Sequence, residues 1–380
     1  MMVSDFILGV LCIVSFFVLL WQWFEAARYP LHSHLKETPY APSVTLFKPL
    51  KGCEARTIEC LTSWIEQDYA GSIQILFGVA DPTDPVIPPL RDLLVKFPQK
   101  EINIIFCSEQ KGHNKKVSSL VQMAPKATGD VWVVSDADIL APRNLLKNLV
   151  QPLRDSSVGA VNCLYRIAGP NNFGTTLEKI AVNADFWSQV IQSLRLGKQD
   201  FCLGAVICVN AEVFRKTGGF EPIADLLADD YHIGNRIHKS GNNIALSTMV
   251  VDSIVPKAKL ADVWKHQLRW ARTIRFERPL SYGLSIISNT TLWALLWIIA
   301  GTWEARYLVC LCVLLTRLIA VKDLMSRIEQ SPGKWHKAWL AWAKDLFQFA
   351  LWIGAFAGNC VVWRGIKFRV HKGGVLEPIK

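Results

Sequence analysis

The chain has 380 residues, of which 51% are hydrophobic, and a formal net charge of +10 at pH 7. The charge is clustered, because residues 44–255 together carry −1, whereas residues 256–278 carry +5 and residues 322–380 carry +6. Nucleic-acid binding needs a basic face on the folded domain, so this distribution argues against nucleic acid as a partner and instead sets basic residues beside apolar segments, where they favour a membrane surface.

The first predicted element is the apolar segment Phe6–Phe24, which carries no formal charge. It is long enough to span a bilayer as a helix. No lysine or arginine precedes it, and WQWFEAARYP follows it, so we expect an uncleaved anchor rather than a signal peptide. Residues 1–27 are therefore interpreted as an N-terminal transmembrane anchor.

Strands and helices alternate after the linker Pro39–Ser43. This alternation is typical of an α/β domain with a parallel sheet covered on both faces, which we place at residues 40–258. Ligands of such sheets bind beyond the carboxyl ends of the strands. The predicted strands are Val44–Phe47, Ile73–Val79, Ile102–Cys107 and Val131–Ser135, and the helix-like stretches between them lie near Thr57–Glu66, Val86–Phe97 and Lys115–Met123.

Acidic residues follow two of these strands. Asp136 and Asp138 follow Val131–Ser135, and residues two apart on an extended chain face the same way. Two close carboxylates repel each other unless a cation compensates them, and Mg²⁺ prefers one or two carboxylates together with phosphate oxygens. The alternative is that an aspartate only caps the next helix. Asp81 follows the strand Ile73–Val79, so both acidic positions fall on the predicted ligand edge.

A basic turn, GHNKKV, lies between these acidic positions in the sequence. Asn114 suits a helix N-cap, and Lys115 or Lys116 could face a phosphate at the N-terminus of that helix. A solvated basic turn is the alternative. We include Asn114 and Lys116 among the candidate residues for binding a phosphate-bearing ligand.

Asp136 and Asp138 form a D-x-D pair, and the alternation of strands and helices becomes mixed beyond it. Val158–Leu164 and Phe201–Val209 are predicted strands, and Thr175–Leu194 is a predicted long helix. Asp225–His238 is a further predicted helix, in which two adjacent acids stand among apolar neighbours. Adjacent acids usually form a solvated face, but a partly buried aspartate has a raised pKa and can serve as a base.

Charged and aromatic side chains interleave in Val263–Arg278, as in an amphipathic helix at a membrane surface. An ordinary basic surface helix is the alternative. We assign residues 259–281 to this interfacial helix. Two apolar runs follow, Gly283–Trp303 and Tyr307–Val321, and predict two transmembrane helices within residues 282–321.

The basic segment 322–337 is predicted to be a cytoplasmic loop. Residues 338–380 are interpreted as a third apolar span, cleanest over Leu346–Trp363, and a basic tail. Three C-terminal spans would put this tail outside, in conflict with its charge. A re-entrant or interfacial last segment therefore stays open as an alternative.

Six short motifs occur in order along the chain, and they are accompanied by an N-terminal anchor and C-terminal apolar spans. The motifs are KPLKG (48–52), GVADPTDP (78–85), GHNKKV (112–117), SDAD (135–138), LADDYH (227–232) and HQLRW (266–270). Together they resemble the ceramide glucosyltransferase family, and most closely its bacterial members, which include hopanoid glycosyltransferases. The resemblance covers roughly residues 5–370, and its specificity lies in the order of the motifs.

The resemblance implies a GT-A (nucleotide-diphospho-sugar transferase, Rossmann-like) catalytic domain with flanking transmembrane helices. It implies an inverting transfer of a hexose from UDP-glucose or UDP-N-acetylglucosamine to the hydroxyl of a lipid, ceramide or hopanoid, with Mg²⁺ or Mn²⁺ as cofactor. An integral protein of a bacterial inner membrane, with its catalytic domain in the cytoplasm, is the corresponding location.

The resemblance also implies roles for individual residues. Asp230 matches the catalytic base, and Asp81 matches the aspartate that faces the uridine. Asp136 and Asp138 match the D-x-D position, with Asp138 as the metal ligand. Three residues match the Q/R-x-x-R-W motif near the diphosphate and the acceptor, namely His266, Arg269 and Trp270.

Two positions depart from the family pattern. His266 stands where Gln or Arg is expected, and Gln267 lies next to it. Asp185 is nearest to a position where some members have a catalytically important histidine, so that role is not transferred to it.

Two other functions stay open. A processive polysaccharide synthase shares the fold, but about three spans after the domain favour a single transfer. A non-catalytic membrane lipid-binding protein is the second alternative, against which the intact acidic positions and Arg269 argue.

Overall fold

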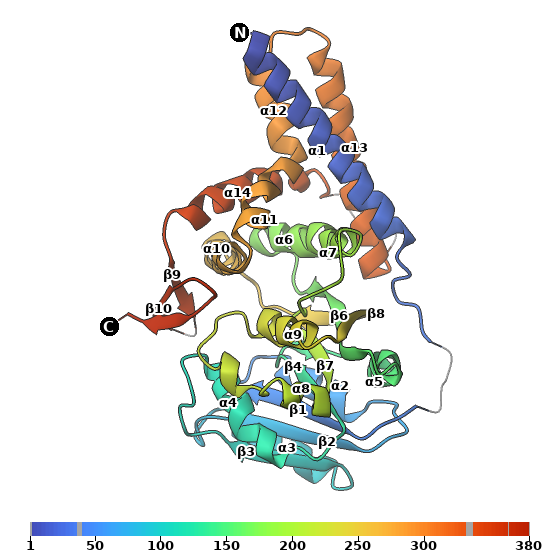
Figure 1. Cartoon of the computed structure of the whole chain (residues 1–380), viewed down its shortest axis with the longest axis vertical. Helices are drawn as coiled ribbons and strands as arrows, with labels where there is room; N and C mark the ends of the chain where they lie inside the picture. The colour runs from blue at the N-terminus through green and yellow to red at the C-terminus, as the bar shows by residue number, and fades with distance from the viewer. Residues whose placement is uncertain (1, 36–39, 332–336, 364, 380) are drawn as a thin grey trace.

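A computed structural model describes residues 2–35, 40–331, 337–363 and 365–379. The elements are arranged in tiers along the long axis of the molecule (Figure 1). A mixed eight-stranded sheet with its covering helices forms one end, further helices cross the middle, and a bundle of three helices forms the other end. The N-terminus lies at the far end of this bundle.

The first half of the sheet is parallel, as predicted. Its order is β3-β2-β1-β4, and β1 lies between β2 and β4 in parallel register. Buried apolar side chains pack on both faces of the sheet, which explains the nearly continuous apolar strands. The strands are β1 (Val44–Leu50), β2 (Ile73–Val79), β3 (Glu101–Phe106) and β4 (Val131–Ser135), and the helices between them are α2 (Thr57–Ile65), α3 (Ile87–Lys96) and α4 (Lys115–Met123).

The second half of the sheet is mixed, so the parallel pairing predicted from the alternation holds for the first four strands. β7 (Val206–Asn210) pairs antiparallel with β4 and with β6 (Val158–Ala168), and β6 pairs parallel with β8 (Asn243–Ile254). β5 (Ile139–Leu140) pairs antiparallel with β8 at the edge. The predicted strand Phe201–Val209 therefore begins only at Val206, and no strand was predicted where β8 forms.

Two predicted helices pack against the second half of the sheet. The helix predicted at Thr175–Leu194 runs through α6 (Phe173–Ile180), a π-helical turn at Ala181–Phe186 and α7 (Trp187–Ser193). α9 (Asp229–Lys239) begins four residues later than predicted. Its buried Ile233 and Ile237 join the core on one face of the sheet, so the packing fixes which side of this helix faces inward.

The bundle consists of α1 (Met2–Arg28), α12 (Thr290–Ala300) and α13 (Arg306–Glu329), which lie side by side in Figure 1. Within the described part of the chain, one helix, Val3–Arg28, is long and apolar enough to cross a membrane. A second crossing would require the bent pair Pro279–Ser288 and Thr290–Ala300, which meet at 57°. The predicted loop 322–337 is wrong in its first half, because α13 continues to Glu329. Residues 332–336 of that loop lie outside the described residues.

The predicted third span is also wrong at its C-terminal end. α14 (Leu340–Phe356) ends before Trp363, and it runs crosswise at the base of the bundle (Figure 1). The tail then forms a small antiparallel sheet from β9 (Cys360–Trp363), β10 (Ile366–Val370) and β11 (Leu376–Pro378). A bridge between Leu226 and Val375 joins this sheet to the α/β domain. The tail and the α/β domain therefore lie on the same side of the bundle.

Candidate functional site

The D-x-D pair lies at the carboxyl end of β4, as predicted. Asp138 is held from β8, because the Ser253 hydroxyl donates to its Oδ2 at 2.9 Å and the Ile254 N–H donates to its carbonyl at 2.9 Å. Burial and the neighbouring Asp136 raise the pKa of the Asp138 carboxyl. A nearby cation would therefore be favoured here, since it would offset both effects.

Lys116 is the lysine of the basic turn that faces this pair. Its Nζ lies 2.8 Å from Asp136 Oδ1 and 2.9 Å from Asp229 Oδ2. Burial lowers its pKa, but the two carboxylates outweigh burial, so the pKa is raised and the ammonium stays charged. Lys115 is exposed. Lys116 thus links the D-x-D pair to the start of α9.

Asn114 caps α4, as predicted. Its Oδ1 accepts from the N–H groups of Lys116 and Val117 at 3.1 Å, and its Nδ2 donates to the Leu226 carbonyl at 2.7 Å. The side chain is fully buried, so it holds Lys116 and the segment before α9 in place.

Lys48 is a site residue that the sequence analysis did not single out, although it lies in KPLKG. It is buried on β1, and its Nζ donates to the Asp136 carbonyl at 2.6 Å and to the Ser135 hydroxyl at 3.0 Å. Burial lowers its pKa to about 7, against the raising effect of Asp138 and Asp136. The signal in the sequence that could have identified it is a lysine within an otherwise largely apolar strand. Through these two hydrogen bonds Lys48 holds the turn that carries Asp136 and Asp138.

Asp230 lies at the start of α9. Its Oδ1 accepts from the Tyr231 N–H at 2.8 Å, and a Cβ at Gly204 would lie 2.9 Å from its Oδ2. The missing side chain at Gly204 therefore makes room for this carboxylate. Burial, followed by the adjacent Asp229, raises the pKa of Asp230 to about 6. This value suits a general base, which works best when its pKa lies near the operating pH.

Arg269 brings α10 (Leu260–Glu277) to the same place. Burial lowers the pKa of its guanidinium, and the carboxylates of Asp230, Asp136 and Asp229 oppose that effect. The guanidinium therefore lies within electrostatic reach of all three carboxylates. The site combines two cations, Arg269 and Lys116, with acidic groups from two elements of the catalytic domain.

His266 and Gln267 anchor α10 to α6. His266 Nδ1 lies 2.7 Å from Glu178 Oε1, and Gln267 Nε2 donates to the same oxygen at 3.2 Å. Glu178 is buried and was not predicted from the sequence, where nothing distinguished it from other helix residues. The His266 ring packs against the Trp270 ring, with 4.5 Å between the ring centroids. We therefore assign His266 to holding α10 and Trp270 in place.

Asp81 lies apart from this group. It is exposed, and its Oδ1 accepts from the Thr83 N–H at 2.8 Å and the Thr83 hydroxyl at 2.7 Å. These hydrogen bonds lower its pKa, so it is ionised near neutral pH. Its strand, β2, neighbours β1, which neighbours β4. Asp81 thus stands on the same edge of the sheet, two strands from the D-x-D pair.

A hollow of about 170 Å³ lies between the catalytic domain, α10 and the bundle. Trp270, Tyr282 and Trp352 are among its apolar lining, and Asp185 and Arg317 belong to its polar wall. The Arg317 guanidinium pairs with both oxygens of Asp185 at 2.9 and 2.8 Å. Asp185 therefore joins the catalytic domain to α13 through a buried ion pair.

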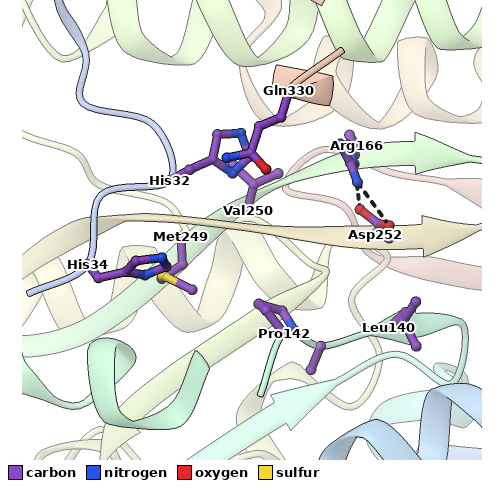
Figure 2. Close-up of a pocket in the computed structure, with 10 residues that line it drawn as sticks. His32, His34, Leu140, Pro142, Arg166, Met249, Val250, Asp252 and Gln330 are labelled. Carbon is purple, nitrogen blue, oxygen red and sulfur yellow. Dashed lines mark hydrogen bonds and ion pairs between the residues drawn. The ribbon is translucent and has the colours of Figure 1, made fainter. Parts of the chain in front are cut away.

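A second hollow, of about 250 Å³, adjoins β5 and β8 (Figure 2). Figure 2 shows Arg166 and Asp252 pairing at its rim, with His32 and His34 on the opposite side. Its described lining contains none of the predicted site residues. One of its lining residues, Leu140, follows Asp138 by two positions in the sequence. The hollow therefore lies next to the candidate site rather than within it.

The acidic pair fits a divalent cation only if other ligands complete the shell. Among the residues that the structure describes, no group of three or more His, Cys, Asp or Glu is placed to hold a metal ion. Mg²⁺ usually keeps several waters and binds through one or two carboxylates plus phosphate oxygens. Asp138, with Asp136 beside it, offers such a partial ligand set.

The fold and the acidic strand edge define the class of protein: a GT-A glycosyltransferase with an α/β sheet and a flanking apolar helix. A mannosyltransferase from Pyrobaculum calidifontis, solved in complex with GDP-Man and Mn²⁺, aligns with a TM-score of 0.55 at 20% identity over 93% of this chain and 98% of its own. The profile of glycosyl transferase family 21 matches residues 7–376, and the chain belongs to that family.

Similar curated proteins are ceramide glucosyltransferases. The Gibberella zeae enzyme is 28% identical over 42% of this chain and 33% of its own length. The Candida albicans enzyme is 36% identical over 28% of this chain and 22% of its own length. Ceramide glucosyltransferase 1 of Caenorhabditis elegans is 24% identical over 58% of this chain and 47% of its own length. The matched region thus spans less than half the length of each of these relatives.

Proposed function

We propose that the chain is an inverting glycosyltransferase that transfers a hexose from UDP-glucose or UDP-N-acetylglucosamine to the hydroxyl of a membrane lipid, ceramide or a hopanoid. The observation that carries the proposal is the meeting of Asp136, Asp230, Lys116 and Arg269 at the carboxyl edge of the sheet. Membership of glycosyl transferase family 21 and the ceramide glucosyltransferase relatives support the lipid acceptor.

The donor side of the site is assigned to the strand ends. Asp81 is proposed to face the uridine, and Asp136 and Asp138 to face the diphosphate. Lys116 and Arg269 are the cations that would stabilise negative charge on the departing UDP, since fixed charges act strongly in a partly buried site. A divalent cation, Mg²⁺ or Mn²⁺, would be held by Asp138 and would supply further stabilisation of the diphosphate.

Asp230 is proposed as the base. Inversion requires one in-line displacement at the anomeric carbon, so a base must take the acceptor proton on the face opposite the leaving group. Asp230 lies on α9, across the site from β4, and burial keeps its pKa near the working pH. Its partner Asp229 is committed to Lys116, which leaves Asp230 as the acidic residue for the acceptor side.

The acceptor is proposed to approach along α10. Trp270 lines the hollow between the catalytic domain and the bundle, while its neighbour Arg269 faces the carboxylates. The apolar α1 and the interleaved aromatic and basic side chains of α10 suit a membrane and its surface. We place the catalytic domain and the basic tail together on the cytoplasmic side, which removes the conflict between tail charge and topology.

The direct test is mass spectrometry of lipids made by the purified protein with each UDP-sugar and with ceramide or a hopanoid. A product that carries one hexose supports the proposal. A ladder of longer products would support a polysaccharide synthase instead. UDP-sugar binding without any glycolipid product would support a non-catalytic protein.

Replacing Trp270 with Ala should lower kcat/KM for the lipid by roughly 10–100-fold, as is typical when a large aromatic anchor in a buried contact is removed. The donor KM should stay close to that of the parent, because Trp270 faces the hollow and not the D-x-D pair. Trp339→Ala is the control, since Trp339 is exposed at the start of α14. Equal kinetics of Trp270→Ala and parent in detergent would refute the assignment.

Transfer should fall as the pH drops through about 6, because Asp230 must be ionised to accept a proton and its pKa is raised to about 6. An ordinary aspartate would keep its activity down to about pH 4. The measurement is kcat/KM for the donor across this range, with folding checked at each pH. An acid limb near pH 4 would contradict the assignment.

A further inference from the structure

The small C-terminal sheet contacts the segment that immediately precedes the proposed base. The Leu227 N–H donates to the Gly374 carbonyl at 2.9 Å, and the Leu376 N–H donates to the Asp225 carbonyl at 2.8 Å. Leu226 and Val375 form the antiparallel bridge between these two bonds. Residues 225–227 thus pair with the tail sheet through this isolated bridge and its two flanking hydrogen bonds, and α9 begins two residues later, at Asp229.

Apolar packing strengthens this attachment. The side chain of Leu227 is buried in one cluster with Val361, Phe368, Val370 and Leu376, which come from all three tail strands. Removing such apolar side chains from water stabilises the contact between them. The tail sheet therefore holds Leu227 firmly, two residues from Asp229.

The tail sheet is fixed to α10 on its other side. The guanidinium of Arg275 donates to the Gly358 carbonyl at 3.0 Å, and that of Arg272 donates to the Cys360 carbonyl. Phe276 of α10 packs against the same apolar cluster. Since α10 also carries Arg269, the tail sheet connects the helix of the proposed diphosphate cation to the helix of the proposed base.

The start of α9 depends on this outside support. Its N-cap position is Ala228, whose methyl side chain cannot accept a hydrogen bond and which ranks among the poorest N-caps. The backbone of the preceding residues is held instead by the tail. Asp225 is held from a further direction, because its Oδ1 accepts from the His113 N–H at 2.8 Å.

We propose that the C-terminal sheet of β9, β10 and β11 is a positioning element that sets the place of Asp230 relative to Arg269 without touching substrate. This inference rests on the proposed function, because it takes Asp230 as the base of the transfer step. It assigns a role in that step to residues that lie outside the six motifs. Small displacements of a catalytic group are costly, up to about 100-fold in rate. The tail residues Val361 and Phe368 are therefore positioning residues.

Adjacent valines on β9 give a matched test. Val361 is 3% exposed and lies in the cluster with Leu227, whereas Val362 is 65% exposed. In the full chain, Val361→Ala and Phe368→Ala should accelerate hydrogen exchange of the Leu227 amide and lower kcat by about 10–100-fold, with the donor KM within about two-fold of the parent. Val362→Ala should match the parent in all three measurements.

The pH profile separates positioning from a general loss of folded protein. A loosened segment admits water around Asp230, and better solvation lowers the pKa of a buried carboxyl, so the acid limb of kcat/KM should move to lower pH in Val361→Ala and Phe368→Ala. Loss of folded protein alone would scale the rate and leave the limb in place.

Two outcomes would overturn the inference. Unchanged exchange at Leu227 would show that the sheet does not hold the segment, and faster exchange with parent-like kcat and acid limb would show that the hold does not serve catalysis. An inactive parent would refute the proposed function instead, and the exchange data would still decide whether the sheet holds the segment.

Discussion

Replacing Asp230 with Asn should lower the rate of sugar transfer by roughly 10²–10⁴-fold, the usual cost of losing a general base. Asparagine has nearly the same shape but cannot accept the acceptor's proton. The affinity for UDP-sugar should change far less, because donor contacts are assigned to the strand ends. The measurements are single-turnover transfer rates and UDP-sugar binding by calorimetry.

Asp229→Asn is the comparison, and the structure changes what is expected of it. From the sequence alone, Asp229→Asn is expected to be the milder of the two substitutions. Asp229 is instead buried and paired with Lys116, so its loss should alter donor binding, because one of the two carboxylates that hold that ammonium in place is removed. It should also shift the acid limb to lower pH, because Asp229 helps to raise the pKa of Asp230. If Asp229→Asn loses the transfer step and Asp230→Asn keeps most of it, Asp229 is the base.

Chelation with EDTA should abolish transfer, and Mg²⁺ or Mn²⁺ should restore it. Asp138 is half-buried, its pKa is raised by burial and by Asp136, and a divalent cation with a diphosphate would relieve both effects. The measurement is transfer rate against free metal concentration. Asp138→Asn should require far more metal for the same rate.

Lys116 is the competing source of positive charge at this pair. Undiminished turnover in EDTA, together with loss of turnover in Lys116→Met, would mean that the lysine and not a metal compensates the carboxylates. Lys115→Met is the matched control, since the neighbouring Lys115 is exposed while Lys116 is buried between Asp136 and Asp229. Parent-like activity of the Lys115 variant would attribute the loss to the buried position.

Local patterns predicted the first half of the fold well. The strands Ile73–Val79 and Val131–Ser135 and the helix Lys115–Met123 have the predicted bounds, because uninterrupted apolar runs and the Asn114 cap determine them locally. β8 was missed. Its sequence alternates poorly, and it is stabilised by pairing with β6, which lies about 85 residues away along the chain. Local sequence carries little information about such distant pairings.

The apolar helices and the C-terminal tail show a similar division. The apolar character of α1 was evident in the sequence, as was the conflict between tail charge and a third C-terminal span. The conflict disappears because the tail pairs with residues 225–227 and α14 lies crosswise. Hydropathy measures only how apolar a segment is, and it cannot report that a short segment turns back to form a sheet with a distant loop.

The sequence by itself determined which chemical groups are present at the site: the D-x-D pair after an apolar strand, the capped basic turn, and the adjacent acids before Tyr231. The tertiary structure decided which of those groups pair with one another and which have room to meet a substrate. It paired Lys116 with Asp136 and Asp229, made room for Asp230 beside Gly204, and turned His266 toward Glu178. The physical reason is that ion pairs and burial depend on distances between segments far apart in the chain, whereas a residue's chemistry is fixed by its identity.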